Sequence, residues 1–328
     1  MQRLRALSGI AFGLFALAVT LQFCGGAAAQ QAYPTRAVRF ILPFNPASAS
    51  DITARMFADR LSARWGKPVI VENRPGGDGI VSIQAFISAN DDHTLWFGPA
   101  GIFTVQPYDH DSLPYESKRD LIPIVSVSDV VLAVSTPVSM KIDTIDQLVA
   151  RAKAEPGKLN AAAATGISDF SLFGWIKSMN LEIVKVPYRD IMQAPNDLAE
   201  ERIQVLATSF AVVQPLMRAG KIKVLAVSSR KRFPAAPDIP TASEAGYPAL
   251  TFESIGGIFG SPGMPENVRE SIAADVRAVS ADPVIAPRLV DIGTIMDIQG
   301  PKEFAASVQT QRNRLAEIAK VLGLKAAQ

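Results

Sequence analysis

Three short segments rich in small and hydroxyl residues could form a ligand cradle. They read PFNPASASD (43–51), FGPAGIF (97–103) and AATGISDFSLF (163–173), and each follows an apolar run and precedes a helical pattern. Unpaired N–H groups at a helix start, with the positive end of the helix dipole, bind an anion without a formal positive charge. Each segment also fits an ordinary turn with a Ser or Asp cap. A carboxylate would suit a site built from them.

Residue types that catalyse reactions or hold metals are few in this chain. His93 and His110 are its two histidines; each lies among acids in an expected surface loop, and neither has a partner at metal-ligand spacing. Ser48 and Ser50 lack the G-x-S-x-G elbow of a hydrolase, and RPGGDG (74–79) fits neither a P-loop nor a dinucleotide fingerprint. We predict no catalytic residue, no metal site and no cofactor. An exported enzyme, the alternative class, would need a base beside a nucleophile.

Strands and helices alternate along the chain and must position these loops. The β-rich runs are Val38–Leu42, Val69–Glu72, Thr94–Phe97, Val130–Ser135, Ile203–Thr208 and Lys223–Ser228. Apolar residues recur at helical spacing between the runs. This alternation predicts an α/β fold with mainly parallel sheets and helices on both faces. Sheets of this kind bind ligands at the carboxyl ends of their strands, where the three loops would lie.

Three helices have recognisable ends in the sequence. The first is expected to start at Asp51 and to close at Gly66. The second begins with Thr144 and Gln147, which have the spacing of a capping box. The third is a long helix with one apolar stripe, over about 304–322.

The first 29 residues have the pattern of a secretory signal. Arg3 and Arg5 precede an uncharged apolar stretch, Leu7–Phe23, and small residues follow. We therefore expect export and cleavage near Ala29. Cys24 allows a rival interpretation as a lipid-anchored protein, although the bulky Phe23 stands where lipid attachment needs a small residue.

Removal of this segment changes the charge and the cysteine count. The chain has 33 basic and 31 acidic side chains, and loss of the two leader arginines leaves 31 of each. A neutral protein has no electrostatic footprint for nucleic acid or an acidic membrane. Cys24 is the only cysteine, so no disulfide or thiolate site would remain.

Longer segments then match one known family, in type and in order. They are YPTRAVRFILPF, GKPVIVENRPGG, TLWFGPAG, VPYRDIMQAPNDL, MRAGKIKVLAVSSRKR, PDIPTASEAGYP and GSPGMPENV. They cover essentially the whole chain after the leader, which resembles the periplasmic solute receptors of tripartite tricarboxylate transporters, the Bug family. The resemblance implies a periplasmic-binding-protein fold, with two α/β domains joined by crossing strands and a ligand cleft between them. Domain 1 would combine residues 30–130 and 228–328, and domain 2 would be 131–227.

The resemblance also implies a function. Receptors of this kind capture small organic acids, namely di- and tricarboxylates, aromatic carboxylates and sometimes amino acids. They hold a carboxylate with backbone amides, hydroxyls and water, and pass it to membrane permease subunits. We therefore expect a periplasmic monomer that is not an enzyme. A receptor of the same fold that feeds a membrane sensor kinase is an open alternative.

Position by position, the resemblance carries over a set of ligand-binding residues. They are Ala47, Ser48, Ala49, Ser50, Asp51, Gly98, Ala100, Thr165, Gly166, Ser168, Tyr188, Arg189, Thr208 and Ser209. Three of them have plainer interpretations: Asp51 as a helix cap, Arg189 as a solvated side chain and Tyr188 as a core ring with a wet hydroxyl.

The sequence departs from the family pattern in two places. The first loop reads NPASASD where PPGGGTD is common, so it loses the positive φ that glycine allows and gains the hydroxyls of Ser48 and Ser50. We expect a different loop path. Gln204 stands where an aspartate is common, which removes a negative charge or only alters the surface. For these reasons the sequence names no single acid.

Overall fold

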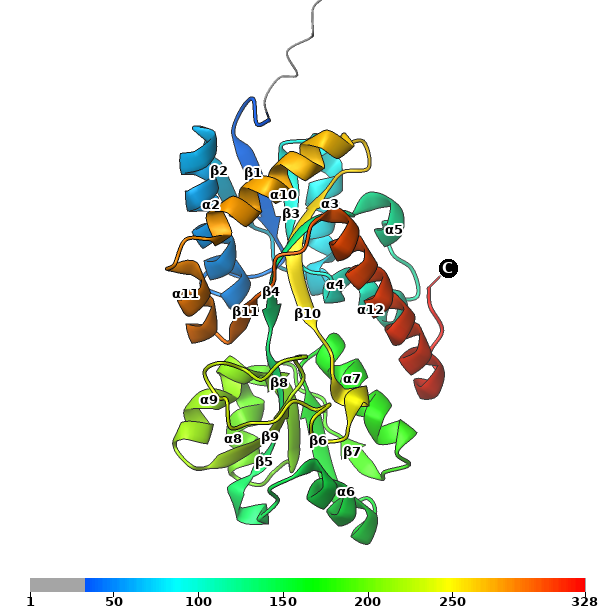
Figure 1. Cartoon of the computed structure of the whole chain (residues 1–328). Helices are drawn as coiled ribbons and strands as arrows, with labels where there is room; N and C mark the ends of the chain where they lie inside the picture. Colours follow the sequence, from blue (N-terminus) through cyan, green and yellow to red (C-terminus); the bar gives the residue numbers. More distant parts are fainter. Residues whose placement is uncertain (1–32, 328) are drawn as a thin grey trace, which may run out of the picture. The chain divides into compact units, whose positions relative to one another are not determined.

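The computed structural model describes residues 33–327. The expected leader, with Cys24 and the cleavage position near Ala29, lies outside the described residues. The chain divides after Thr35, and every helix and strand described below belongs to the unit that begins at Arg36. Figure 1 shows that this unit contains two sheets, each with its own helices.

The first sheet has six strands in the order β11-β4-β10-β3-β1-β2. Their bounds are β1 Val38–Leu42, β2 Val69–Asn73, β3 Thr94–Pro99, β4 Ile122–Val130, β10 Ser254–Gly260 and β11 Thr294–Met296. β1 is parallel to β2 and β3, whereas β10 is antiparallel to both β3 and β4. β11 is antiparallel to β4 at the sheet edge.

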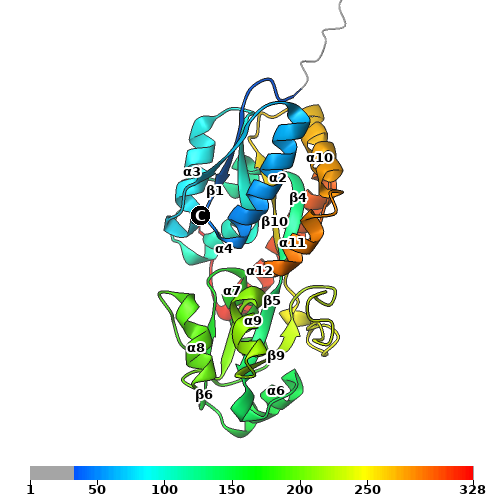
Figure 2. The ribbon, with the colours of Figure 1, turned by 90° about the vertical axis from the view of Figure 1, so that its left-hand side faces the viewer.

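Helices cover both faces of this sheet. One face carries α2 (Ala49–Trp65), α10 (Glu266–Ser280) and α11 (Ile285–Asp291), and the other carries α3 (Ile80–Ala89), α4 (Gly101–Asp109) and α12 (Pro301–Leu322). Figure 2 separates α3 and α4 from α10 and α11 across the sheet. Trp96 and Phe259 of the sheet pack edge-to-face against Phe103 of α4. The short helix α5 (Ser117–Asp120) follows α4.

The second sheet has five strands in the order β7-β6-β8-β5-β9. Their bounds are β5 Leu132–Pro137, β6 Leu159–Ala163, β7 Ile183–Lys185, β8 Val205–Ser209 and β9 Ile222–Val227. Helices α6 (Ile145–Ala154) and α7 (Ile167–Ser178) share one apolar cluster, and α8 (Ala194–Ala199) and α9 (Phe210–Arg218) share another. The 3-10 turns are η1 Gly77–Gly79, η2 Val138–Met140, η3 Ile191–Gln193 and η4 Pro248–Leu250. The α/β prediction, with helices on both faces, is confirmed.

The expectation of mainly parallel sheets is wrong. Of the nine strand pairings within residues 33–327, five are antiparallel. The chain leaves the first sheet through β4, enters the second through β5 after the single residue Val131, and returns as β10. The predicted strand Val130–Ser135 straddles this crossing. The sequence did not predict β6, which reads LNAAA, or β10, which reads SIGGIFG. Both strands are rich in alanine or glycine, which have low β-propensity.

The predicted close of α2 at Gly66 and the predicted capping box of α6 are confirmed, whereas α2 begins at Ala49, before the expected start at Asp51. Gly66 closes α2 in the left-handed conformation, with φ +61°. The hydroxyl of Thr144 accepts the backbone N–H of Gln147, whose side chain in turn accepts the N–H of Asp143. The long C-terminal helix ends at Leu322.

We call the first sheet with its helices the first lobe, and the second sheet with its helices the second lobe. Strands of the first lobe fall within 38–130 and 254–296, and those of the second within 132–227. The domain bounds inferred from the resemblance stay a prediction.

Side chains from both lobes also share a small apolar core. It contains Ile167 and Phe170 of α7 together with Val105 of α4 and Leu315 of α12. α7 lies close to α12, because a Cβ added at Gly174 would come within 2.5 Å of the Ile318 side chain. Throughout residues 33–327, no helix is long and apolar enough to cross a membrane.

Candidate functional site

A cavity of about 780 Å³ lies where loops of the two lobes meet. Residues that follow β1, β2 and β3 line it from the first lobe, and residues that follow β6 and β7 line it from the second. Leu132 and Ser254, at the chain crossings, complete the wall. These are carboxyl ends of parallel strands, the position where open α/β sheets bind ligands. The three loops singled out in the sequence all reach this cavity: the first at Pro43 and Phe44, the second at Pro99, Gly101 and Ile102, and the third at Ala163 and at residues 165–169.

Helix starts supply backbone N–H groups to the cavity. Gly101 and Ile102, the first residues of α4, line it, and so do Ile167 and Ser168, the first residues of α7. Gly166 precedes α7 with φ +83°, a conformation that favours glycine. The first N–H groups of a helix have no intrahelical acceptor, and the dipole is positive there. This part of the wall therefore favours a negative group.

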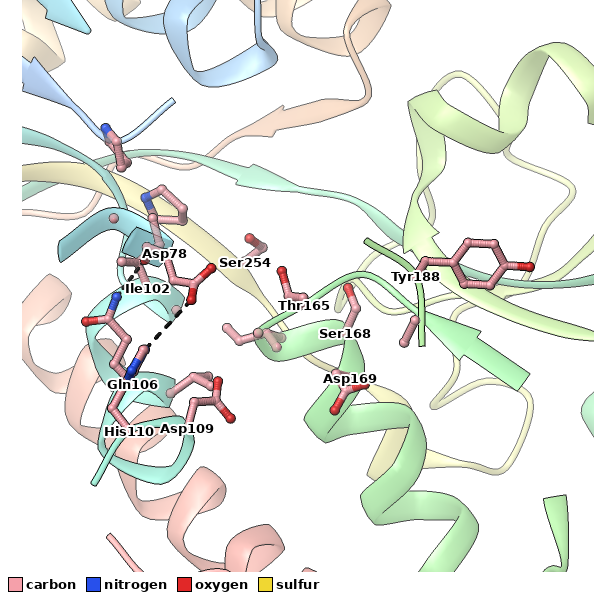
Figure 3. Close-up of a pocket in the computed structure, with 18 of the residues that line it drawn as sticks. Asp78, Ile102, Gln106, Asp109, His110, Thr165, Ser168, Asp169, Tyr188 and Ser254 are labelled. Atoms are coloured by element: carbon pink, nitrogen blue, oxygen red, sulfur yellow. Dashed lines mark hydrogen bonds and ion pairs between the residues drawn. The ribbon is translucent and has the colours of Figure 1, made fainter. Parts of the chain in front are cut away.

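The charged side chains in the rest of the cavity are mainly acidic, so they favour a positive group. Asp78, Asp109 and Asp169 line it against Lys185, whose Nζ lies 2.6 Å from an oxygen of Asp169. Burial and the neighbouring charge of Asp169 raise the pKa of Asp109. Figure 3 shows Asp78 and Asp109 on one side, and Asp169 on the other. His110 adds a ring nitrogen 3.8 Å from the Asp78 carboxylate.

Hydrogen bonds fix the loop that presents Asp78. The side-chain amide of Gln106 on α4 donates to the backbone carbonyl of Asp78 at 2.6 Å. The hydroxyl of Tyr115 in turn donates to the amide oxygen of Gln106. Asp78 itself has φ +51°, so the neighbouring helix holds a loop conformation that is uncommon for aspartate.

Four of the residues carried over by resemblance line the cavity: Thr165, Gly166, Ser168 and Tyr188. Thr165 and Ser168, on either side of the start of α7, face the cavity (Figure 3), and Gly166, the N-cap of α7, also lines it. The ring of Tyr188 extends away from it, and its hydroxyl donates to Asp197 at 2.7 Å. Burial and this bond raise the pKa of Tyr188 to about 12, so the phenol stays neutral.

The remaining residues of that set lie outside the cavity wall. They are Ala47, Ser48, Ala49, Ser50, Asp51, Gly98, Ala100, Arg189, Thr208 and Ser209. Ala100 and Thr208 are buried, and Ser209 precedes α9. Arg189 is exposed to solvent. Their role in ligand binding stays a prediction.

The first loop is held by its own contacts. Ser48 caps α2 by accepting the N–H of Asp51 at 3.2 Å. Asp51 is 2% exposed and accepts from Arg55, from Asn73 and from the N–H of Ala47. Although burial raises the pKa of Asp51, these hydrogen bonds outweigh it and lower the pKa. Ala47 has φ +67°, so alanine adopts here the positive φ that the loss of glycine was expected to remove.

Sequence reasoning missed several lining residues. These include Gly76–Gly79, Gln106, Asp109, His110, Lys185 and Ser254. One signal was available: RPGGDG follows β2 and precedes α3, the same strand–loop–helix position that identified the other three loops. The lining side chains of α4 gave no such signal, because a helix residue reaches a cavity through packing rather than through a motif.

The two histidines differ from the solvated surface role expected of both. His93 is only 4% exposed, and its Nδ1 contacts Asp92, so the expectation is wrong for it. It lies immediately before β3. Among the described residues no group of acids, histidines or cysteines could hold a metal ion. Gln204 lies away from the cavity and accepts the backbone N–H of Asn160 at 2.8 Å.

The chain is similar to known proteins over most of its length. A family model described as tripartite tricarboxylate transporter family receptor matches residues 53–324. A UPF0065 protein of Bordetella bronchiseptica is 28% identical over 97% of this chain and 95% of its own. Protein BugT of Bordetella pertussis is 31% identical over 66% of this chain and 68% of its own.

Solved structures with the same architecture extend the comparison. An R. palustris protein solved with adipate has a TM-score of 0.76 and 26% identity, over 90% of this chain and 100% of its own. The periplasmic binding protein BugD has a TM-score of 0.72 and 25% identity, over 90% of this chain and 100% of its own.

Proposed function

The chain belongs to the tripartite tricarboxylate transporter receptor family, and from this membership we propose that it captures a small organic acid in the periplasm and delivers it to a membrane permease. The observation that supports the proposal most directly is the convergence of the starts of α4 and α7 on one cavity. Their free N–H groups would hold one carboxylate without an arginine. The similar R. palustris protein was solved with adipate, a dicarboxylate.

Capture in such a receptor needs no bond-breaking step. Closure of the lobes over the ligand would shift the population toward a form whose surface the permease recognises. Loops from both lobes line the cavity, so a ligand bridging them would favour the closed form. In this proposal the protein works as a monomer, without a cofactor and without changing its ligand.

The acids of the cavity favour a second candidate ligand class, a carboxylate that also carries a protonated amine. Asp78, Asp109 and Asp169 face the same space, and the single lining lysine is already paired. A second carboxylate on the ligand would meet like charges, whereas an ammonium group would find acceptors. One cavity could then hold both ends of the ligand, the carboxylate at the helix starts and the ammonium at the acids.

Thermal unfolding of residues 30–328, freed of co-purified ligand, tests both classes with a matched pair. Adipate and 6-aminohexanoate have similar lengths and differ in one end group. Ligand at a hundred times its Kd adds about 2.7 kcal/mol of stability, which raises Tm by at least a few degrees. A rise with adipate alone supports the dicarboxylate class, and a rise with the amino acid alone supports the second class. No rise with either of these or with malate, aromatic acids and α-amino acids would contradict capture of an organic acid.

A variant that fills the first cavity tests whether the ligand binds there. Thr165→Trp introduces a large ring at an exposed position of the cavity wall, and Thr310→Trp makes the same change on the exposed surface of α12. We expect the first to lose the ligand-induced rise and the second to keep it. Unchanged binding in folded Thr165→Trp would contradict the assignment of this cavity.

Delivery is tested in cells that lack the receptor. Loss of uptake of the radiolabelled ligand supports delivery to a permease. Normal uptake with loss of a ligand-induced transcriptional response would support the sensing alternative instead.

A further inference from the structure

A second cavity, of about 670 Å³, lies on the opposite side of α4 from the first. We call it the rear cavity. Its wall comes from α4, from the segment 113–119 that includes α5, from α12, and from the chain end at Ala326 and Ala327. Figure 1 shows these elements together beside the six-stranded sheet. The two cavities share no lining residue, so α4 separates them.

Aromatic and apolar side chains form much of the rear cavity. Phe103 and Tyr108 of α4 and Leu113 and Tyr115 of the following segment line it. The hydroxyl of Tyr115 donates to Gln106, and burial raises the pKa of Tyr115, so this residue presents a neutral phenol. Such a wall suits a flat or apolar body.

The cationic side chains of this cavity exceed its anionic ones. Arg119 donates to Asp120 at 2.7 Å and is thereby neutralised. Arg312 has no carboxylate partner of this kind among the described residues: it donates to the hydroxyl of Ser117 at 3.3 Å, and its guanidinium carbon lies 5.5 Å from the centroid of the Phe103 ring. Within residues 33–327 no carboxylate forms an ion pair with Arg312 or with Lys118, although Glu116 lies near enough to act on Arg312 electrostatically.

Burial makes this arrangement of Arg312 unfavourable for an isolated protein. The guanidinium is partly buried against the Phe103 ring, and burial lowers the pKa of Arg312. A guanidinium taken out of water is stabilised best by a carboxylate that accepts two parallel N–H bonds. No carboxylate in the described part of the chain makes such a pair with Arg312, while Arg312 lines the open volume of the rear cavity.

We propose that the rear cavity is a second binding site, for a small monocarboxylate with an aromatic or apolar body. Arg312 binds the carboxylate, Lys118 adds positive charge at the rim, and the aromatic wall holds the body. The inference does not depend on the function proposed for the first cavity. Since α4 lines both cavities, a ligand in either one contacts the helix that also forms part of the other's wall.

Isothermal titration with benzoate, and with neutral benzamide as the uncharged control, tests the proposal. The full mature chain is used in four forms: wild type, Thr165→Trp to fill the first cavity, Arg312→Gln, and, as the matched control, Arg288→Gln, an exposed change on α11 outside both cavities. We expect benzoate to bind wild type, Thr165→Trp and Arg288→Gln alike. Arg312→Gln should weaken binding at least tenfold, and benzamide should bind weakly to every form.

Three results would overturn the proposal. They are the absence of benzoate binding at millimolar concentration, binding that Thr165→Trp abolishes, and binding that survives Arg312→Gln. Arg312→Lys keeps the charge and the packing stem but loses the two-pronged geometry, so it should bind with intermediate affinity. If both Arg312 variants fail to fold, Ala316→Phe on α12 can be used instead, because its ring would fill the rear cavity. Benzoate binding as tight as that of the wild type in folded Ala316→Phe would overturn the proposal.

Discussion

The ammonium of Lys185 lies 2.6 Å from a carboxylate oxygen of Asp169, so the lysine that lines the first cavity is already neutralised. The two residues come from β7 and from the first turn of α7, elements of the same lobe. In the proposed function, an incoming anion would therefore depend on the N–H groups at the starts of α4 and α7, and the acids Asp78 and Asp109 would decide which second group the ligand tolerates.

Removal of one acid should change ligand preference in a predictable direction. Asp109→Asn removes a carboxylate whose ionisation the negative charge of nearby Asp169 already disfavours. We expect adipate to bind about fivefold more tightly and 6-aminohexanoate to bind more weakly by a similar factor, as for one solvent-exposed charge pair of about 1 kcal/mol. Titration calorimetry measures both. Asp238→Asn, an exposed change outside the cavity, is the control, and equal shifts in the two variants would contradict the role of Asp109.

The pH dependence of stability should depend on Asp129 of β4. This residue is 8% exposed, and one of its carboxylate oxygens has no hydrogen-bond partner among the described residues. Burial and the charge of Glu253 raise the pKa of Asp129, while Asp297 adds to the repulsion and Arg230, paired with Glu253 at 2.7 Å, opposes it. The native state therefore holds the proton more tightly than the unfolded chain does. Stability falls as pH rises from the unfolded pKa, near 4, through the raised native pKa.

Asp129→Asn removes this ionisation and should reduce the loss of stability between pH 4 and pH 8 by about 1 kcal/mol or more. Glu253 and Asp297, whose pKa values burial also raises, keep part of the slope in the variant. Urea unfolding across that pH range measures the effect, with Asp238→Asn as the exposed control. A slope in Asp129→Asn equal to that of the wild type would refute the prediction.

Alanine substitutions at two glycines that have the same φ distinguish the cost of backbone strain from the cost of a steric clash. Gly293 and Gly323 both have φ +76°. A Cβ added at Gly293 would lie 2.8 Å from the Cβ of Ala211 on α9, whereas a Cβ added at Gly323 would have no other atom within 4 Å. We expect Gly323→Ala to cost about 1 kcal/mol of stability and Gly293→Ala to cost roughly 1–3 kcal/mol more. Urea unfolding of the two variants measures the difference. Equal costs would mean that Ala211 moves aside freely.

The hydroxyl of Ser48 has a measurable structural role. Ser48→Ala removes the cap of α2 and should cost about 1 kcal/mol. Its effect on ligand affinity is the informative part. Since Ser48 lies outside the cavity wall, we expect the Kd to stay within about twofold of the wild type. A tenfold loss of affinity would instead support the direct ligand role that the resemblance implies. Ser50→Ala, which removes no cap, is the matched control.

Local patterns in the sequence predicted local structure well. The Gly66 stop, the Thr144–Gln147 pair and the strand Val38–Leu42 all depend on residues close in sequence, and each is confirmed. Strand direction depends instead on where the chain crosses between sheets. One residue, Val131, separates β4 from β5, and no local signal marks that break.

The cavity shows the same distinction. Strand–loop–helix position identified three loops that reach it, because in this fold chain order alone brings those loops to the carboxyl ends of the sheet. It did not identify which residue of each loop faces inward. Asp51 has a ligand-like residue type but bonds to Arg55 and Asn73, and Asp109 faces the cavity from the far end of a helix.

The apolar core shared by α7, α4 and α12 has a consequence for folding cooperativity. Phe170 belongs to a helix of the second lobe, yet it is buried against Val105 and Leu315 of the first. Neither lobe can lose its structure without exposing side chains of the other, so heat or urea should melt the two together in a single transition. If the cavity opens and closes as proposed, the same contact would keep α7 against α12, so opening of the receptor and its unfolding would be separate events.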